Sequence, residues 1–266
     1  MSVLPEAQTT AIASHGAEDV HVRGHSLCRD LIGQVGFTEM LLLQMLGRRP
    51  SAAETAAIDA CLVALMEHGL TPSVLAARLT YSSAPEAIQA AVAAGLLGVG
   101  SRFAGSMEGC AELLARLLAA ADGGAEARAI AAEHRAARRP IPGFGHPVHK
   151  PDDPRAVRLL RLARDRGVAG RHVAAIEALS HAVDDVYGKH ITINATGAIA
   201  AILGDCGVPP GIARGFALIA RCAGLVGHIL EEQQKPAMRA IWEAAERAVP
   251  YEEPLSRTAG ERGPSQ

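Results

Sequence analysis

The sequence predicts an all-α fold, and three observations support this prediction. The chain of 266 residues is 49% apolar, so it can bury a sizeable core. Aromatic residues make up only 3% of it, and alanine and leucine supply most of the apolar content, which favours helix because these side chains lose little freedom there. Segments rich in valine, isoleucine, threonine and aromatic residues are scarce, so a fold based on a sheet is not expected.

The two ends of the chain are expected to be flexible. Residues 1–20 are predicted to form a loose leader, and residues 255–266 a polar tail that contains glycine and proline. The leader has no basic start followed by an apolar run, so a signal peptide is not expected. No apolar stretch reaches the length of a membrane span without a charge or a break, so contact with a membrane is not expected either.

Cysteine content and charge indicate the compartment and the class of partner. The five cysteines are scattered and have no spacing typical of a metal site. Buried free thiols in a reducing compartment are the expected state, and a cytoplasmic protein follows from it. The net charge is −2 at pH 7, long basic runs are missing and aromatic platforms for bases are few, so nucleic-acid binding is not expected.

Start signals predict three helices in the first hundred residues. Each signal combines a capping side chain with an acidic residue three positions later, or with a proline at the first turn. These pairs are Ser51 with Glu54, Thr71 with Pro72, and Ser83 with Glu86. The first of these helices is expected to stop near Gly69 and the third at Gly98.

The rest of the chain is predicted to be helical apart from one loop and one short extended piece. Two prolines and two glycines make residues 139–145 a shaped loop that cannot be regular helix. Asp153 followed by Pro154 predicts the start of the next helix. Residues 190–193 are expected to be extended. The helices themselves are expected at residues 107–121, 125–138, 154–167, 171–187, 195–204 and 210–234.

The segment GFGHPVHKPDDPRA, residues 143–156, contains the strongest candidate for a catalytic residue, His146. Histidine titrates near neutral pH and therefore suits proton transfer. Prolines on both sides of His146 stiffen the loop, and Gly143 and Gly145 allow a substrate to approach the backbone closely. We therefore interpret this segment as part of an active site.

Two arginines are candidates for binding an anion. Arg155 lies in the first turn of a predicted helix, where the helix dipole disfavours a cation unless an anion is close. That anion is either a substrate carboxylate, which suits the planar guanidinium, or one of the neighbouring Asp152 and Asp153. Arg221 lies within an apolar helix, where an unpaired charge costs on the order of several kcal/mol. It should therefore face a carboxylate, from the substrate or from the protein itself.

His68 and Arg102 give weaker signals. His68 is either a site residue or a residue that the dipole favours at a helix C-terminus. Arg102 lies in the Gly-rich turn GVGSRFAGS, whose free amides could hold an anionic group. His146 and His149 have no third or fourth ligand nearby in the chain, so a metal site is not expected.

At these residues the chain resembles the citrate synthase superfamily, and within it the short citryl-CoA lyase branch. GFGHPVHKPDDPRA is similar to the most specific motif of the family, GFGH-x-V-x-K-x-x-DPRA. Five further segments resemble family segments and occur in the family's order between Arg23 and Met238. They are RGHSLCRDLIGQVGFTEMLL, EHGLTPSVLAAR, GVGSRFAGSMEG, ITINATGAI and FALIARCAGLVGHILEEQ.

The resemblance implies a fold, an assembly and a reaction. It implies an all-α homodimer in which each subunit has a large helical domain and a small helical domain that closes over the active site. The large domain would comprise residues 21–107 and 190–250, and the small domain residues 108–189. The implied reaction joins or cleaves a carbon–carbon bond between an acyl-CoA thioester and a 2-oxo acid, with the CoA thioester as substrate and no bound cofactor.

The resemblance also implies roles for individual residues. His146 would contact the carbonyl or alcohol oxygen and transfer its proton. The carboxylates of an oxaloacetate-like moiety would be bound by His68, Arg155 and Arg221. Further substrate contacts are implied for Arg102 and Asn194, and Arg239 or Lys235 near the C-terminus would reach the site of a partner subunit. Contacts with the CoA thioester are implied for Gly143, Phe144, Gly145 and Lys150.

Two catalytic positions distinguish the possible reactions. Phe103 stands where citrate synthases have the histidine that stabilises the enol, and the lyase branch also has phenylalanine there. Thr196 stands where both branches have the catalytic aspartate. A threonine hydroxyl cannot act as a carboxylate base at neutral pH, although it could donate a hydrogen bond to an enolate.

Three functions follow as hypotheses. The first is a citryl-CoA lyase-like enzyme that cleaves a citryl-CoA-like thioester to acetyl-CoA and oxaloacetate, or catalyses the reverse condensation; Phe103 favours the lyase. The second is the same scaffold with a changed reaction on another acyl-CoA, which the threonine at position 196 favours. The third is a CoA-ester-binding protein without catalysis. His146 and Arg155 argue against the third, since a protein that only binds needs no imidazole at the reacting oxygen.

Overall fold

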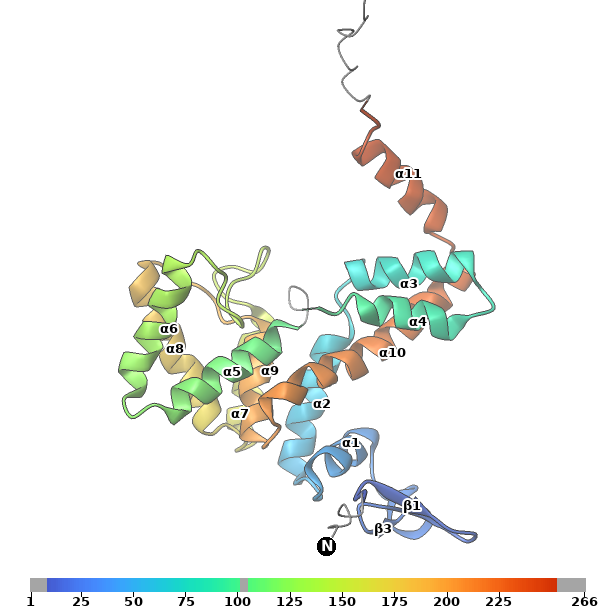
Figure 1. The fold of residues 1–266 in the computed structure, drawn as a ribbon, viewed down its shortest axis with the longest axis horizontal. Helices are drawn as coiled ribbons and strands as arrows, with labels where there is room; N and C mark the ends of the chain where they lie inside the picture. Colours follow the sequence, from blue (N-terminus) through green and yellow to red (C-terminus); the bar gives the residue numbers. More distant parts are fainter. Residues whose placement is uncertain (1–8, 101–104, 253–266) are drawn as a thin grey trace, which may run out of the picture.

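The computed structural model describes residues 9–100 and 105–252. Helices dominate this part of the chain (Figure 1), which confirms the predicted all-α class. The long helices are α1 (Phe37–Leu46), α2 (Ala52–Met66), α3 (Pro72–Ser83), α4 (Ile88–Leu97), α5 (Ser106–Ala119), α6 (Gly123–Ala136), α7 (Pro154–Asp165), α8 (Arg171–Tyr187), α9 (Ala195–Asp205), α10 (Ala213–Gln234) and α11 (Met238–Ala248). Two short turns of helix are η1 (Leu27–Leu31) and η2 (Pro210–Ile212).

The N-terminal part of the described chain contains a small antiparallel sheet. Its strands, in spatial order, are β1 (Ala13–His15), β2 (Val20–Val22) and β3 (His25–Ser26). The predicted loose leader, residues 1–20, therefore includes the strand β1 and the first residue of β2. The carboxylate of Asp19 fixes the turn before β2, because it accepts hydrogen bonds from the Val20 amide (2.7 Å) and from the hydroxyl of Ser26.

The predicted helix starts are confirmed in part. Ser51 and Glu54 form the expected capping box at the start of α2. Thr71 precedes α3 as expected, but its side chain makes no capping hydrogen bond. The second capping box is wrong. Ser83 is the last residue of α3, where its hydroxyl donates to the carbonyl four residues back (3.1 Å), and α4 begins only at Ile88.

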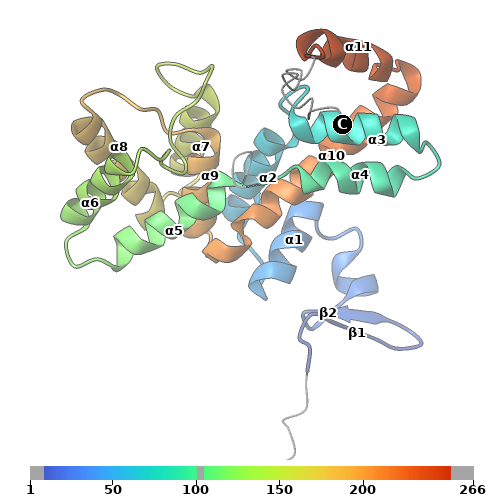
Figure 2. The same ribbon diagram turned by 45° about the horizontal axis from the view of Figure 1, so that its top comes forward.

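Two groups of helices lie on either side of α2 and α10 (Figure 1). Helices α5 to α9 pack together in one group, and α3 and α4 form a helical hairpin in the other. The longest helix, α10, packs against α2, α3, α4 and α5 and so connects the two groups. In Figure 2, α11 lies on one side of this arrangement and α1 with the small sheet on the other. One apolar core extends from α1 and α2 through α5 to α9 and into α10.

The predicted division into two domains stays a prediction. Helix α9 was assigned to the large domain, residues 21–107 and 190–250, and it packs against α5, α7 and α8. Helices α5, α7 and α8 belong mainly to the segment assigned to the small domain, residues 108–189. A boundary at residue 190 would therefore cut through a set of packed helices.

The segment Pro210–Gln234 is the one described helix that is long and apolar enough to cross a membrane, judged by length and composition alone. It carries the charged residues Arg214 and Arg221, so it is not a stretch without a charge. The core helix of a globular protein passes the same test. Packing against four other helices, with Arg221 buried, explains the apolar character of α10.

Helix α11 follows α10 and was not predicted. No residue of α11 is buried. Its first turn is fixed by Glu232, which is 2% exposed and accepts hydrogen bonds from the amides of Ala237 (2.8 Å) and Met238 (3.0 Å). The same carboxylate accepts a hydrogen bond from the guanidinium of Arg78 (2.8 Å). A buried network inside the fold therefore sets where this exposed helix begins.

The loop before α7 is held against the chain that leads into α9. Backbone hydrogen bonds join the Gly145 amide to the Thr192 carbonyl (2.8 Å) and the Asn194 amide to the Gly143 carbonyl (3.0 Å). The chain before α9 pairs with this loop as an isolated antiparallel bridge, in agreement with the predicted extended conformation. This pairing fixes the segment that carries His146 relative to the start of α9.

Gly143 is needed for a different reason from the substrate access expected from the sequence. Its φ is +86°, and a Cβ there would meet the Sγ of Cys110 at 2.5 Å and the Cα of Gly197 at 3.0 Å. The loop therefore lies directly on α5 and α9. Gly145 also has a positive φ (+78°), but the nearest atom to a Cβ there would be 3.9 Å away.

These two glycines make a matched pair for a stability measurement. Gly143→Ala is expected to lower the free energy of unfolding by at least about 3 kcal/mol, because the backbone conformation and two close contacts all oppose a Cβ. Gly145→Ala meets only the unfavourable backbone conformation and is expected to cost about 1–2 kcal/mol. Urea unfolding followed by circular dichroism measures both. Equal losses would show that the contacts with Cys110 and Gly197 do not constrain the loop.

Candidate active site

A cavity of about 330 Å³ lies between the end of α2, the loop before α7, the start of α9 and the middle of α10. Its lining combines segments that are far apart in the chain. Seven of the residues singled out from the sequence line it, namely His68, Gly145, His146, Arg155, Asn194, Thr196 and Arg221. The fold therefore brings most of the candidate site residues into one place.

His146 is held in one orientation by its own loop. Its Nδ1 atom accepts hydrogen bonds from the amides of Val148 (3.2 Å) and His149 (3.0 Å). In the neutral ring, Nδ1 then carries the lone pair and Nε2 carries the proton. Burial, together with the nearby charges of His149 and Arg155, lowers the pKa of His146. The ring is therefore neutral at pH 7 and offers an Nε2–H donor.

Arg155 pairs with Asp153, through Nε (3.0 Å) and Nη2 (2.8 Å), so the ion pair that was the alternative to substrate binding is present. Its Nη2 also lies 3.3 Å from the Nε2 of His146. A guanidinium only donates hydrogen bonds, and Nε2 of the neutral ring carries a proton, so two donors face each other here. An oxygen acceptor placed between them, such as a carboxylate or carbonyl oxygen, would satisfy both.

Asp153 organises this side of the cavity. Its side chain is 0% exposed, and besides the guanidinium it binds the amides of Arg155 (3.0 Å) and Ala195 (3.1 Å). Burial raises the pKa of Asp153, but the hydrogen bonds from Arg155 and Ala195 outweigh it, and the pKa is lowered overall. One ionised carboxylate thus joins the first turn of α7 to the first turn of α9 and holds Arg155 as well.

Arg221 is a buried cation with an unpartnered donor. It is 7% exposed, and its Nη1 makes no hydrogen bond to any residue that the structure describes. Burial lowers the pKa of Arg221, and the negative charge of Glu67 opposes this shift. The carboxylate expected opposite Arg221 is thus not bound to Nη1 by the described chain. A buried donor at a cavity wall favours an anionic ligand, because leaving it unpaired is costly.

Glu67, which the sequence analysis did not single out, fixes the turn that carries His68. One carboxylate oxygen accepts a hydrogen bond from the amide of His68 (2.7 Å), and the other accepts one from the Nε2 of His228 (2.8 Å). Arg78 donates to Nδ1 of His228 (3.1 Å), so the ring proton is on Nε2 and the ring donates to Glu67. The spacing of seven residues from Arg221 to His228, two turns along one helix face, is the signal that could have identified His228.

Thr196 belongs to the start of α9 and is not a free base. Its hydroxyl donates to the Oδ1 of Asn194 (2.7 Å) and lies 2.8 Å from the Oγ of Ser106, which then donates to it. Asn194 caps the helix by accepting the Gly197 amide (3.1 Å), and its Nδ2 donates to the Gly145 carbonyl (3.0 Å). Thr196 could donate to an enolate only after leaving Asn194.

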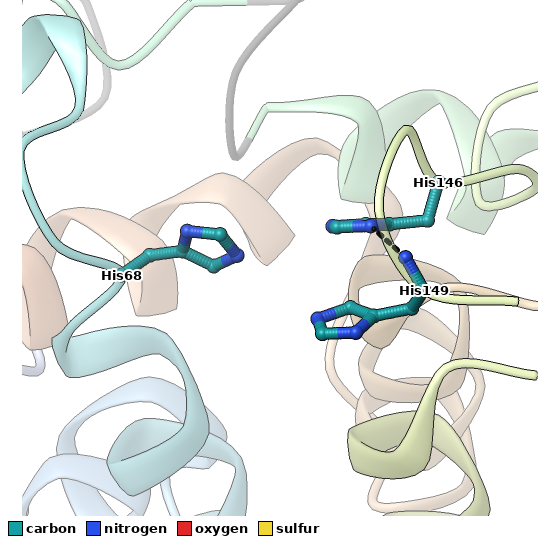
Figure 3. Close-up of side chains that lie close together, drawn as sticks. All are labelled: His68, His146 and His149. Carbon is teal, nitrogen blue, oxygen red and sulfur yellow. Dashed lines mark hydrogen bonds between the residues drawn. The ribbon is translucent and has the colours of Figure 1, made fainter.

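Three histidines meet at the cavity (Figure 3). His68 points towards His146 and His149, which lie on the other side of the gap between them; His68 and His146 line the cavity. The ring centroids of His68 and His146 are 5.9 Å apart, and the rings of His146 and His149 stack at 4.3 Å. One ring nitrogen of each lies within 4.8 Å of the others. A third imidazole thus lies near His146 and His149 in space, although no further ligand lies near them in the sequence.

The remaining candidates do not line this cavity in the described chain. Gly143 lies against α5 and α9, Phe144 is buried in the core, and Lys150 is exposed. Arg239 lies in the first turn of α11 with a side chain that is 89% exposed. The structure does not describe Arg102 and Phe103, which fall between the two described ranges.

Residues 11–242 match the family described as citrate synthase, C-terminal domain. The structure is similar to that of citryl-CoA lyase from Hydrogenobacter thermophilus, with a TM-score of 0.84 and 30% sequence identity. This similarity covers 96% of the present chain and 98% of the other. The likeness therefore extends over nearly the whole of both chains.

Two longer proteins are also similar. A Mycobacterium tuberculosis protein, provisionally named citrate synthase 2, is 31% identical over 192 residues, which are 70% of this chain and 49% of the relative. An ATP citrate lyase from Methanosaeta concilii, solved in complex with (3S)-citryl-CoA, has a TM-score of 0.75 at 19% identity and shows a shared fold. That similarity covers 96% of this chain and 43% of the lyase. The chain thus spans half or less of the length of these two proteins.

Removing the charge of Asp153 is expected to weaken the fold in a pH-dependent way. Asp153→Asn should lower the free energy of unfolding at neutral pH by about 2–4 kcal/mol, because Arg155 loses its buried partner. The pKa of Asp153 is lowered in the folded state. Its stabilisation is therefore complete above the unfolded pKa of about 3.9 and is lost as the pH falls through the folded value.

Urea unfolding of wild type and variant over a pH series measures this effect. The difference between them should shrink below about pH 4. Asp152→Asn, at the exposed neighbouring position, should cost less than about 1 kcal/mol at any pH. A difference for Asp153→Asn that does not change with pH would contradict the assignment of the charge to this network.

Arg221→Met is expected to leave the free energy of unfolding unchanged or to raise it by about 1–2 kcal/mol, because it removes a buried charge with an unpartnered donor. The matched control is Arg78→Met. Arg78 is also buried but pairs with Glu232 and His228, so its loss should cost about 3 kcal/mol. Thermal unfolding of both variants decides the point. Equal destabilisation would mean that Arg221 is a structural cation.

Proposed function

This chain belongs to the citrate synthase family, and on that basis we propose that it is a citryl-CoA lyase-type enzyme. It cleaves the carbon–carbon bond of a citryl-CoA-like thioester to give acetyl-CoA and oxaloacetate, or catalyses the reverse condensation. The similarity to citryl-CoA lyase over nearly the full length of both chains supports this proposal. The whole reaction, including the identity of the acyl group, is part of the proposal.

The single observation that carries the proposal is that N–H donors converge in one cavity without sufficient acceptors. They are the Nε2–H of His146, the Nη2 of Arg155 beside it, and the unpartnered Nη1 of Arg221. A substrate in which a hydroxyl or carbonyl oxygen is flanked by carboxylates supplies acceptors for all three. An oxaloacetate or citryl group has this arrangement.

His146 acts at the reacting oxygen. In the condensation direction the enolate carbon attacks the carbonyl carbon, and the oxygen that receives the electron pair takes a proton from Nε2. The cleavage direction is the reverse of this step: the ring that has given up its Nε2 proton takes the alcohol proton, the carbon–carbon bond breaks, and its electron pair passes to the thioester enolate. The lowered pKa of His146 keeps the ring neutral, so Nε2–H can donate without a prior protonation.

The CoA part of the substrate is assigned to the other side of the loop. A second cavity of about 370 Å³ is lined by Phe144 and Gly145. It also contains Arg135, Arg138 and Arg139, whose positive charges suit the phosphates of a CoA thioester. The assignment of Gly143 and Lys150 to CoA stays a prediction, as does the expectation that no further cofactor is bound.

A second candidate function is favoured because no strong base is positioned for the proton exchange at the thioester carbon. Thr196 replaces the family's aspartate, and its hydroxyl is committed to Asn194. Glu67 is the only carboxylate among the described residues that line the cavity. Burial raises the pKa of Glu67, but hydrogen bonds from His228 and two amides lower it overall, which makes Glu67 a weak base. A changed reaction on another acyl-CoA is therefore the second candidate.

A homodimer is the proposed assembly. Phe37 is 73% exposed and Val63 is 63% exposed beside a groove between α1, α2 and α10, and Trp242 on α11 is 59% exposed. Exposed apolar patches of this kind favour association. In such a dimer Arg239 would reach the cavity of the second copy, in keeping with its exposure on α11 in one chain.

Citryl-CoA tests the proposal directly. The purified chain is mixed with citryl-CoA, and acetyl-CoA and oxaloacetate are followed over time. Turnover should fall by at least about 100-fold in His146→Ala, because the proton transfer at the reacting oxygen is lost. His149→Asn, three residues away on the same loop, is the control and should retain turnover.

The other outcomes separate the alternatives. No turnover in the wild type, but turnover gained in Thr196→Asp, would replace the lyase proposal by the changed reaction. Tight binding of CoA esters with no turnover of any thioester would leave a binding protein. Equal turnover in wild type and His146→Ala would remove His146 from the chemistry.

A further inference from the structure

Three imidazoles from two separate parts of the chain meet at the cavity (Figure 3). His68 comes from the turn between α2 and α3, and His146 and His149 come from the loop before α7. One ring nitrogen from each lies within 4.8 Å of the other two. The proposed reaction uses His68 and His146 for substrate and gives His149 no role. A third imidazole at this point therefore needs a separate explanation.

The distances are close to those of a metal site. Zinc binds histidine nitrogen at about 2.0–2.1 Å, which places two ligands of a tetrahedral ion about 3.4 Å apart. The three nitrogens must therefore approach each other by about 1.4 Å at most. His68 is exposed, and His146 and His149 are half-buried, so side-chain rotation can supply this movement. The His149 ring, which stacks on His146 at 4.3 Å, has to turn so that its lone pair faces the ion.

The loop already holds the ring of His146 in an orientation that suits a metal ligand. Both amide contacts to His146 are made at Nδ1, so Nε2 is the atom left for an ion. A fixed hydrogen bond on the other ring nitrogen is the usual support of a metal-binding histidine.

The neighbouring charges limit the affinity and select the ion. Arg155 lies 3.3 Å from the Nε2 of His146, and Asp153 offsets its charge through two hydrogen bonds. Glu67, next to His68, adds negative charge on the other wall. Three nitrogen ligands without a carboxylate in the cluster suit Zn²⁺, Co²⁺, Ni²⁺ or Cu²⁺, and they do not suit Mg²⁺ or Ca²⁺, which bind oxygen.

We propose that His68, His146 and His149 form a binding site for a divalent transition-metal ion of the zinc type. The ring proton leaves the Nε2 of His146 when the metal ion binds, and the ion is coordinated by the lone pair on that nitrogen. It also occupies the space of the substrate oxygen. Metal binding therefore inhibits the proposed reaction, and this consequence, unlike the site itself, rests on the proposed function.

Binding is tested without substrate. The full chain is stripped of metal with a chelator, and Zn²⁺ affinity is measured by competition with a chromophoric chelator, with Co²⁺ absorption as a second readout. One equivalent should bind, and the affinity should fall at least tenfold in His149→Asn. His181→Asn, an exposed histidine on α8, is the matched control and should bind like the wild type. Equal affinity in wild type and His149→Asn, or no stoichiometric binding, overturns the site.

Inhibition is tested separately. Zn²⁺ should inhibit citryl-CoA turnover in the wild type at the concentrations that fill the site, His149→Asn should need at least tenfold more, and a chelator should restore activity. Activation by Zn²⁺ would overturn the inhibitory consequence. Zinc binding through His149 in a chain that does not turn over citryl-CoA would refute the proposed reaction and leave the metal site standing.

Discussion

The buried carboxylate of Asp153 is the interaction on which the rest of the site depends. A charge removed from water is stable only when its oxygens are fully hydrogen-bonded, so the positions of all its donors are set together. Here those donors are the first turn of α7, the first turn of α9 and the guanidinium of Arg155. Arg155 in turn lies against His146. The geometry around His146 and Arg155 thus depends on an acid that lies behind them.

What the sequence predicted well are features whose causes act within a few residues. Glycines, prolines and a capping aspartate shape the loop around His146, and the helix after it begins where Asp153 predicts. The capping pair at Ser83 failed because the same side chain can close the preceding helix, and here it does so. Contacts between distant segments did not follow from local pattern. The approach of His68 to His149 requires the packing of α2 against α7 and α9, and the support of Glu67 by His228 requires the packing of α2 against α10.

The polar groups on two sides of the cavity differ in whether the protein itself supplies their hydrogen-bond partners. Arg221 has an unpartnered donor, and His146 and Arg155 face each other as donors, so this wall is complete only with an anionic oxygen present. The wall at Thr196 is already complete, since its hydroxyl is bound to Asn194 and Ser106. At a position where the resemblance implies a catalytic aspartate, this chain has a threonine that is part of a helix start. The resemblance alone shows which residue changed, and the structure shows what the new residue does instead.

The buried glutamate at the end of α10 has a consequence for the proposed homodimer. Glu232 binds Arg78 inside the fold and the first amides of α11 outside it. The direction in which α11 leaves α10 thus depends on an internal ion pair, in addition to the contact of the helix surface with α3. Substitutions on that surface would change what the helix adheres to, whereas a substitution at Arg78 would change where it points. A defect in the proposed assembly can therefore originate at Arg78, a residue buried inside one chain.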